Sequence, residues 1–563
     1  MTFLPILERE LRVAARKRST AWLRVVAALV ALIIGSGFLT ISLVTGMGTA
    51  QFGRGLFGTL TWLALATAIA AGLFFTADCL SEEKREGTLG FLFLTDLRGV
   101  DVVGGKLLAT SLRGTYALLA IFPILAVTLL MGGVTGGQFW RCALAILNAL
   151  FCSLATGLVV SSVSRDSQRA LAGTFLVLLL LCVVGPLVDR ILLSAVHFRA
   201  WLGFTSPAYA FWAATAWGRS GFWPALCLSH AVGWLALGLA GVLVRRTWQD
   251  RPSSLWGAAG RLGYSGAPGN APTCQLKRQK LLEPNPVMWL ASRSRWQSIG
   301  IWLLAGITLC CFGFGTLTLP TIVWIAWRPV SRFVVLSLYL WVASQAPRFF
   351  IEARRSGLLE VLLVTPLGGR DIVVGQWRAF RRSFGLPLLL LLLVQAAGAL
   401  LAQHASFLAM SAAGQWGGSS WILEAFAAAL DLMSTTANLV TLFWVGMWMG
   451  LTTKSASMAV LKTLLFVEVL PAMVIYFVST ILAAAVMLGG MFRSAATPSP
   501  GVLAAYPVLM TAVWAALTAA KDTVFFLWAS NNLHKRFRLE ASPRVKSGAW
   551  AGRGAPSPNP PPL

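Results

Sequence analysis

Apolar stretches of about 20 residues recur along the chain and alternate with shorter polar connections. A helix of that length crosses the hydrocarbon core of a bilayer. We therefore predict an all-α, polytopic membrane protein with about 12 transmembrane helices. The predicted spans are residues 22–45, 55–77, 109–133, 139–163, 169–194, 221–244, 299–320, 329–347, 384–403, 423–451, 457–488 and 503–522.

The composition agrees with this pattern. Of 563 residues, 57% are hydrophobic and 12% are charged, and the charged share is about half of that in soluble proteins. The net charge of +26 does not indicate a nucleic-acid partner. A nucleic-acid binder gathers basic and aromatic residues on one domain, whereas here the basic residues are spread over alternate connections between spans.

The positions of the basic residues predict the orientation. Lys and Arg precede the first span, lie between spans two and three and between spans four and five, and follow span six, whereas connections such as 132–138 are nearly uncharged. The second half repeats this order. Because cytoplasmic loops retain positive charge, we place both termini in the cytoplasm. Arg328, Arg332 and Arg493 run against the rule.

One polar segment occurs twice. Residues 82–106 read EEKREGTLGFLFLTDLRGVDVVGGK, and residues 352–376 read EARRSGLLEVLLVTPLGGRDIVVGQ, with 11 of 25 positions identical. Self-similarity of this kind indicates one structural unit built twice. We therefore predict two parallel six-helix repeats.

The repeat and the changes in composition divide the chain into six parts. Residues 247–284 are rich in Gly, Pro and Ser, which is typical of a flexible linker. The predicted parts are an amphipathic N-terminal helix at 1–20, a first six-span half at 21–246, a cytoplasmic linker at 247–284, a second amphipathic helix at 285–298, a second six-span half at 299–538 and a disordered cytoplasmic tail at 539–563.

The repeated segment itself predicts a short cytoplasmic helix joined to two spans. A charged helix end leaves the membrane at 82–86, and Gly87 permits a sharp turn. Apolar residues then follow at i, i+3 and i+4, which favours a helix lying flat against an apolar surface. We expect Gly99 and Gly369 to end these short helices, and Asp101 and Asp371 to cap the next spans.

The segment resembles the permeases of ABC transporters of the type-2, exporter class. The resemblance rests on an acidic and basic stretch, then GTL, a Leu-rich turn and GK before a span, together with the six-span layout and the amphipathic N-terminal helix. The second copy departs from the motif at Leu358 and Gln376. The residues that match are Glu82, Glu83, Lys84, Arg85, Glu86, Gly87, Thr88, Leu89, Leu92, Gly105 and Lys106, and Glu352, Arg355, Gly357, Leu359, Leu362 and Gly375.

This resemblance implies that the repeated segment is a coupling helix that docks on a separate ATP-binding-cassette ATPase subunit, with two copies bound. ATP and Mg would then belong to the partner, and residues 196–221 would form a short outer hairpin. The coupling residues implied are Glu82, Glu83, Arg85, Glu86, Gly87, Thr88, Leu89, Leu92, Glu352, Arg355, Gly357, Leu359 and Leu362. Residues 99–107 lack the glycine spacing and the Ser or Thr of a phosphate loop, so we expect no ATP site in this chain.

Ionisable residues also occur within the predicted spans of the second half, where they are costly. Asp431 and Glu468 are predicted to lie deepest, and Lys521 and Asp522 near the inner end of the last span. Two interpretations stay open, a polar path for substrate or cations through Asp431 and Glu468, and simple pairing between helices.

The sequence therefore predicts the transmembrane permease of an ABC exporter in the cell membrane, in contact with membrane lipid. It predicts no enzyme activity, because the four histidines are scattered and no His/Asp/Glu constellation is present. It predicts no metal, because neither a CxxC nor a Cys/His cluster is present, and no cofactor bound by the chain. The alternative is a twelve-span secondary transporter driven by an ion gradient. The substrate stays open.

Overall fold

The computed structural model describes residues 18–541, except for 46–47, 95–97, 187–188, 190–201, 216–220, 248–285, 292–295, 319, 413–420, 454 and 494–499. Within these ranges the chain forms helices and turns, and no strand. The predicted all-α class is confirmed for this part of the chain. The N-terminal helix expected at 1–20, apart from its last three residues, lies outside the described residues, as do the linker at 247–284, apart from Thr247, and the tail beyond 541.

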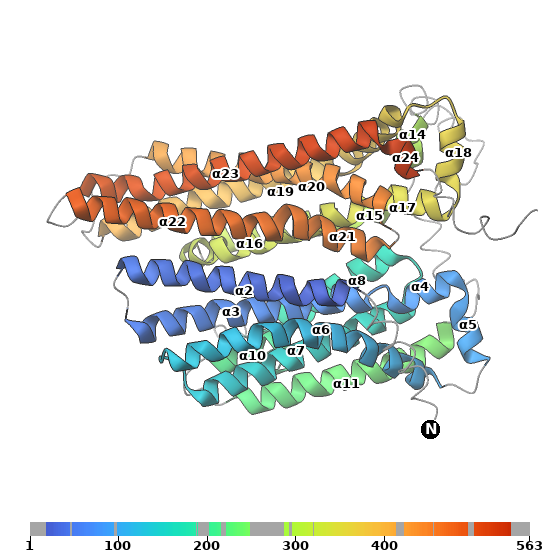
Figure 1. The fold of residues 1–563 in the computed structure, drawn as a ribbon, viewed down its shortest axis with the longest axis horizontal. Helices are drawn as coiled ribbons and strands as arrows, with labels where there is room; N and C mark the ends of the chain where they lie inside the picture. Colours follow the sequence, from blue (N-terminus) through green and yellow to red (C-terminus); the bar gives the residue numbers. More distant parts are fainter. Residues whose placement is uncertain are drawn as a thin grey trace, which may run out of the picture.

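The helices form two bodies, drawn in blue to green and in yellow to red (Figure 1). The first body contains α2 (Arg18–Thr45), α3 (Thr49–Ala71), η1 (Gly72–Thr76), α4 (Cys79–Glu86), α5 (Thr88–Phe93), α6 (Gly99–Leu130), α7 (Gly136–Val163), α8 (Ser167–Leu179), η2 (Leu180–Val184), η3 (Leu202–Thr205), α10 (Pro207–Thr215) and α11 (Phe222–Thr247).

The second body repeats much of this order. It contains α14 (Pro286–Ala291), α15 (Trp296–Thr318), α16 (Pro320–Gln345), α17 (Arg348–Arg355), α18 (Leu358–Val364), α19 (Gly369–Ala412), α20 (Trp421–Thr452), α21 (Ala456–Leu464), η4 (Leu465–Val469), α22 (Leu470–Arg493), α23 (Pro500–Lys535) and α24 (Phe537–Ala541). In both bodies the helix that follows the fourth predicted span runs into one π-helical turn, η2 after α8 and η4 after α21.

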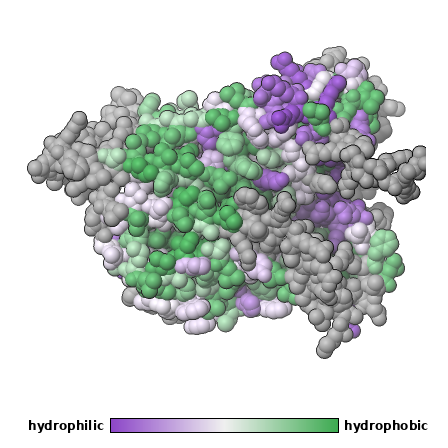
Figure 2. All heavy atoms as spheres, in the orientation of Figure 1, coloured by the Kyte–Doolittle hydropathy of each residue, from purple (hydrophilic) through white to green (hydrophobic). Residues whose placement is uncertain are grey.

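Among the described residues, nine helices are long and apolar enough to cross a membrane. Shorter apolar helices occupy Ala28–Thr40, Arg169–Cys182 and Gly300–Cys310, where three more spans were predicted. Hydrophobic residues cover the long helices in Figure 2, and hydrophilic residues gather at the end that carries α4, α17 and α18. The chain is thus a multi-pass membrane protein, and the number twelve and the orientation stay predictions.

Each body has its own hydrophobic core, and a smaller apolar cluster joins the two. This cluster brings Leu73, Ala77 and Leu171 of the first body against Leu340 of the second. In addition, α2 packs on α22, and η1 and α8 pack on α21. The two bodies therefore meet along their second and fifth predicted spans, with the first span also contributing.

Glycines allow the second and fourth spans of each body to touch. A Cβ on Gly157 would lie 2.1 Å from Thr76 Oγ1, and one on Gly446 would lie 2.5 Å from the Ala346 Cβ. A side chain at either glycine would force the backbones apart. Residues 157–170 (GLVVSSVSRDSQRA) also resemble residues 446–459 (GMWMGLTTKSASMA), and Gly157 and Gly446 are the first residues of these two segments. The same close contact is therefore built twice.

Two expectations about the ends of the repeated segment are wrong. Gly99 and Gly369 do not end the short helices but begin α6 and α19, so these helices start well before the predicted spans at 109 and 384. Asp101 and Asp371 do not occupy the cap position. Each is the third residue of its helix and accepts a hydrogen bond from the backbone N–H of the residue three earlier, at 2.9 and 3.1 Å.

Candidate functional site

The repeated segment folds in the same way in both bodies. The second span continues as α4 or α17, the chain reverses at a glycine, and a short helix, α5 or α18, follows. Gly87 has φ 71° and Gly357 has φ 72°, in the left-handed region that favours glycine. The predicted sharp turns are therefore confirmed. Both short helices lie at the same end of the molecule (Figure 1).

One face of each short helix is buried against its own body. Leu89 is 2% exposed and belongs to the first core, and Leu359 and Leu362 belong to the second. The predicted apolar stripe therefore holds α5 and α18 in place. The side chain of Leu92 lies outside the described residues.

The opposite face carries exposed apolar side chains. Phe91 is 71% and Leu94 is 79% exposed on the α5 side, and Val361 is 62% and Val364 is 89% exposed on the α18 side. Val361 and Val364 follow Phe91 and Leu94 by 270 positions, the offset of the sequence repeat. Both copies thus present a pair of apolar side chains at matching positions, and the sequence interpretation did not single out these four residues.

The start of α4 is fixed by side chains. Ser161 Oγ, on α7, accepts hydrogen bonds from the backbone N–H groups of Leu80 and Ser81, at 2.9 and 3.0 Å. These N–H groups have no partner within the helix, so Ser161 supplies the cap from a neighbouring helix. Asp78 Oδ1 accepts from Ser81 Oγ at 2.6 Å and pairs with Arg85 Nη2 at 2.9 Å.

In each body a basic residue joins the end of the second span to the fourth span. In the first body it also reaches the sixth span, and in the second body it also reaches α24, the short helix that follows the sixth span. Lys84 Nζ donates to the carbonyl oxygen of Ser162 and to Thr247 Oγ1, the latter at 2.8 Å. Arg354 Nη2 donates to the carbonyl oxygens of Leu451 and Glu540, the latter at 3.1 Å.

Lys84 and Arg354 occupy matching positions in the sequence repeat, and both reach a carbonyl oxygen at the end of the fourth span (Gly136–Val163 or Trp421–Thr452). A cation is favoured there because the last carbonyls of a helix have no helical partner. We call Lys84 and Arg354 the clamp residues. They were missed as a pair because the two side chains differ.

The third span is attached to the second by different contacts in the two bodies. Lys106 Nζ on α6 pairs with Glu83 Oε1 on α4 at 2.6 Å. In the second body Gln376 Nε2 donates to the carbonyl oxygen of Ala346 at 2.9 Å. The departure of Gln376 from the motif therefore replaces an ion pair by a hydrogen bond that still joins the two spans.

The two matched segments also meet each other. Glu82 Oε1 of the first lies 3.8 Å from Arg355 Nη2 of the second. Arg348, at the start of α17, pairs with Asp166, between α7 and α8 of the first body, at 3.6 Å and with Glu352 at 2.7 Å. Glu86 and Thr88 stay exposed on the outer side of the turn. The predicted site residues are thus partly brought together across the two bodies.

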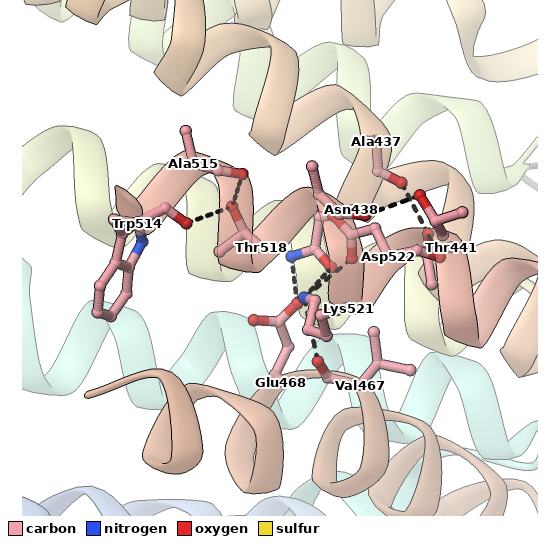
Figure 3. Close-up of polar contacts among 12 residues, drawn as sticks. Ala437, Asn438, Thr441, Val467, Glu468, Trp514, Ala515, Thr518, Lys521 and Asp522 are labelled. Atoms are coloured by element: carbon pink, nitrogen blue, oxygen red, sulfur yellow. Dashed lines mark hydrogen bonds and ion pairs between the residues drawn. The ribbon is translucent and has the colours of Figure 1, made fainter. Parts of the chain in front are cut away.

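A second polar group lies inside the apolar region of the second body (Figure 3). Lys521 Nζ donates to Asn438 Oδ1 at 2.9 Å and to the carbonyl oxygen of Val467 at 3.2 Å, and it pairs with Asp522 Oδ1 at 2.9 Å. Asn438 Nδ2 donates to Glu468 Oε1. We call these residues the Lys521 cluster.

The Lys521 cluster changes the interpretation of the charges in the spans. The expected place of Lys521 and Asp522 near the inner end is wrong, because Lys521 lies 14 residues before the end of α23, or about 21 Å along the helix. Asp431 is exposed on α20, about two turns from Asn438, and is not among the partners of Glu468. The hydrogen bond from Asn438 to Glu468 fits the interpretation of pairing between helices better than that of a polar path.

The first body has a polar group without carboxylates or lysines that joins the same two spans. Asn148 Nδ2 on α7 donates to Ser229 Oγ on α11 at 2.7 Å, and His230 Nδ1 lies 3.0 Å from Asn148 Oδ1. In the part of the chain that the structure describes, no group of three or more His, Cys, Asp or Glu residues could hold a metal ion.

Comparison with known proteins adds one finding. Residues 4–217 match the model of the family described as ABC-2 family transporter protein. The matched range contains the first repeated segment and the first five predicted spans, and it supports an ABC-2 type permease, a membrane transport component. No curated protein matches the chain.

Proposed function

We propose that the chain is the transmembrane permease of an ATP-binding-cassette exporter in the cell membrane, with two six-span halves fused in one polypeptide. A separate ATPase subunit, in two copies, binds and hydrolyses ATP with Mg. The observation that carries the proposal is the pair of short helices at one end, each with two exposed apolar side chains at matching positions, Phe91 and Leu94 on one and Val361 and Val364 on the other.

In this proposal the ATPase docks on α5 and α18. When a partner covers exposed apolar side chains, the complex is stabilised by about 1.5–3 kcal/mol for each side chain that becomes fully buried. The acidic and basic residues around the turns surround this surface, namely Glu82, Glu83, Arg85, Glu86, Glu352 and Arg355. Gly87, Thr88 and Gly357 shape the turns, and the buried Leu89, Leu359 and Leu362 hold the helices. Leu92 belongs to the same proposed coupling segment.

The contacts at the inner end supply a mechanical link from the docking surface to the spans. The clamp residue Lys84 ties α4 to the fourth and sixth spans, and Arg354 ties α17 to the fourth span and to α24. A displacement of α5 therefore moves three spans of the first half together, and a displacement of α18 moves two spans and α24 of the second half. The pairs Glu82–Arg355 and Asp166–Arg348 hold the two halves together at the same end and would separate when this end opens.

Docking can be tested by affinity purification from the native membrane. Wild-type chain is expected to retain an ATP-binding-cassette ATPase, and the variant F91D/V361D to lose it, because both apolar pairs then carry a charge. L539D is the matched control, since Leu539 on α24 is 72% exposed at the same end of the molecule. An ATPase retained equally by F91D/V361D, or no ATPase on the wild-type chain, would overturn the proposal.

The alternative of an ion-driven secondary transporter receives less support. It needs Asp431 and Glu468 as a relay, but Asp431 is exposed and Glu468 accepts a hydrogen bond from Asn438. The family match over residues 4–217 also favours the ATP-driven permease.

A further inference from the structure

The helix α19 carries three arginines on its outer surface. Arg378, Arg381 and Arg382 are all exposed, at the i, i+3, i+4 spacing that places side chains on one side of a helix. Among the described residues, no ion pair involves any of the three. The chain therefore places three positive charges together without a carboxylate to balance them.

The same side of α19 faces lipid further along. Leu386, Leu389 and Leu393 follow Arg382 at steps of four, three and four residues. These leucines are 59%, 53% and 54% exposed. Such a stripe lies on one face of a helix. Exposed leucines on a helix apolar enough to span the membrane indicate the face that contacts acyl chains.

The depth of the arginines follows from the length of the helix. Its candidate span, Gly369–Leu401, has 33 residues, whereas about 20 cross the hydrocarbon core. The excess lies on the side of Gly369, because the continuous apolar run begins at Leu386. The arginines precede this run by one to two turns, which places them at the level of the lipid headgroups.

The position of a tryptophan also supports a place for the arginines at the depth of the lipid headgroups. Trp377, next to Arg378, packs against Phe380 and Phe443, with ring centroids 6.0 and 5.3 Å apart. Tryptophan is enriched where the headgroups meet the hydrocarbon. The first body has no arginine at the three matching positions. Leu108, Ser111 and Leu112 stand at the matching positions of α6.

We propose that Arg378, Arg381 and Arg382 bind the phosphate group of an anionic phospholipid in the leaflet next to α5 and α18. The arginine guanidinium donates two parallel hydrogen bonds to phosphate oxygens, and the leucine stripe receives the acyl chains. The lipid is the ligand, and not free phosphate, because the arginines and the leucines share one face. The site is present in one half, so the lipid distinguishes the two halves of the permease.

The test uses the full chain in nanodiscs of phosphatidylcholine with or without phosphatidylglycerol, and native mass spectrometry to count the lipids retained. The wild-type chain is expected to retain phosphatidylglycerol in preference to phosphatidylcholine. R378Q/R381Q/R382Q is expected to lose about 100-fold of this preference, since each basic residue near an anionic surface contributes about fivefold. K535Q/R536Q/R538Q is the matched control, because it removes three exposed positive charges from the same half.

An unchanged preference in R378Q/R381Q/R382Q, or an equal loss in the control, would overturn the site. Displacement of the lipid by inorganic phosphate would also overturn it, because the acyl chains would then contribute nothing. A photoreactive phosphatidylglycerol on the wild-type chain gives a test that needs no variant. Label is expected on the peptide that contains 378–382, and label confined to other peptides would contradict the proposal.

Discussion

Glu82 Oε1 lies 3.8 Å from Nη2 of Arg355, and the two residues come from the two copies of one sequence repeat. Glu82 is the first residue of its copy, and Arg355 is the fourth residue of the other. Both side chains are more than a third exposed. An ion pair in such a place contributes about 0.2–1 kcal/mol, so it is weak enough to break during each transport cycle.

The contact predicts a cross-link between the halves. In a variant without the native cysteines, E82C/R355C is expected to form a disulfide readily in the resting chain and to block transport when it forms. E86C/R355C is the control, because Glu86 is one turn further along α4 and has no ion pair with Arg355. Equal cross-linking of both pairs, measured by mobility on a gel, would show that the two segments do not meet as described.

The clamp residues should contribute more to stability than exposed basic residues do. We expect K84M and R354M each to lower the free energy of unfolding by about 1–3 kcal/mol, because a carbonyl oxygen at a helix end loses its charged hydrogen-bond donor. R370M is the control, since Arg370 is exposed. Thermal unfolding in detergent measures the effect, and a loss in R370M as large as in K84M would argue against the clamp.

The turn glycines should resist substitution for a reason of backbone conformation alone. A Cβ on Gly87 or Gly357 would meet nothing within 4 Å, but both residues have positive φ. G87A and G357A should each lower the free energy of unfolding by about 1–2 kcal/mol, and asparagine should be tolerated better than alanine. G58A, in open space within α3, should be neutral or stabilising.

The Lys521 cluster should be sensitive to the loss of the Lys521 ammonium group, which pairs with Asp522 and donates to Asn438. K521M leaves the carboxylate of Asp522 without its ion pair and should destabilise the chain by about 3–5 kcal/mol. K462M is the matched control, because Lys462 is exposed, and should change the stability by about 0.5 kcal/mol or less. Recovery of stability in K521M/D522N would confirm the pairing, and a K521M chain as stable as K462M would contradict it.

The sequence predicted the fold class and the local turns better than the contacts between helices. The reversal at Gly87 and Gly357 follows from the sequence, since glycine is the residue that adopts positive φ without strain. The clamp was missed because Lys84 and Arg354 play one role with two different side chains. A comparison that counts only identical residues therefore misses the shared role of this position in the two copies.

The other features that the sequence did not predict also depend on how the helices pack against one another. Glu468 is hydrogen-bonded to Asn438 on α20, and Asn438 accepts a hydrogen bond from Lys521 on α23. The packing of the helices brings these residues together, and hydropathy along the chain does not predict it. The exposed faces of α5 and α18 were also not predicted. The i, i+3, i+4 pattern marks the buried side of such a helix, and the apolar residues left outside, such as Phe91, do not follow it.

Photo-cross-linking from Phe91 and Val361 tests the central claim most directly. A photoreactive phenylalanine analogue is placed at each position in the full chain, and the cross-linked protein is identified from native membranes by mass spectrometry. The account predicts a covalent adduct with an ATP-binding-cassette ATPase from both positions, and none from Leu119, which is 57% exposed on the membrane-spanning part of α6. Absence of an ATPase adduct from both Phe91 and Val361, with the chain inserted and folded, would contradict it.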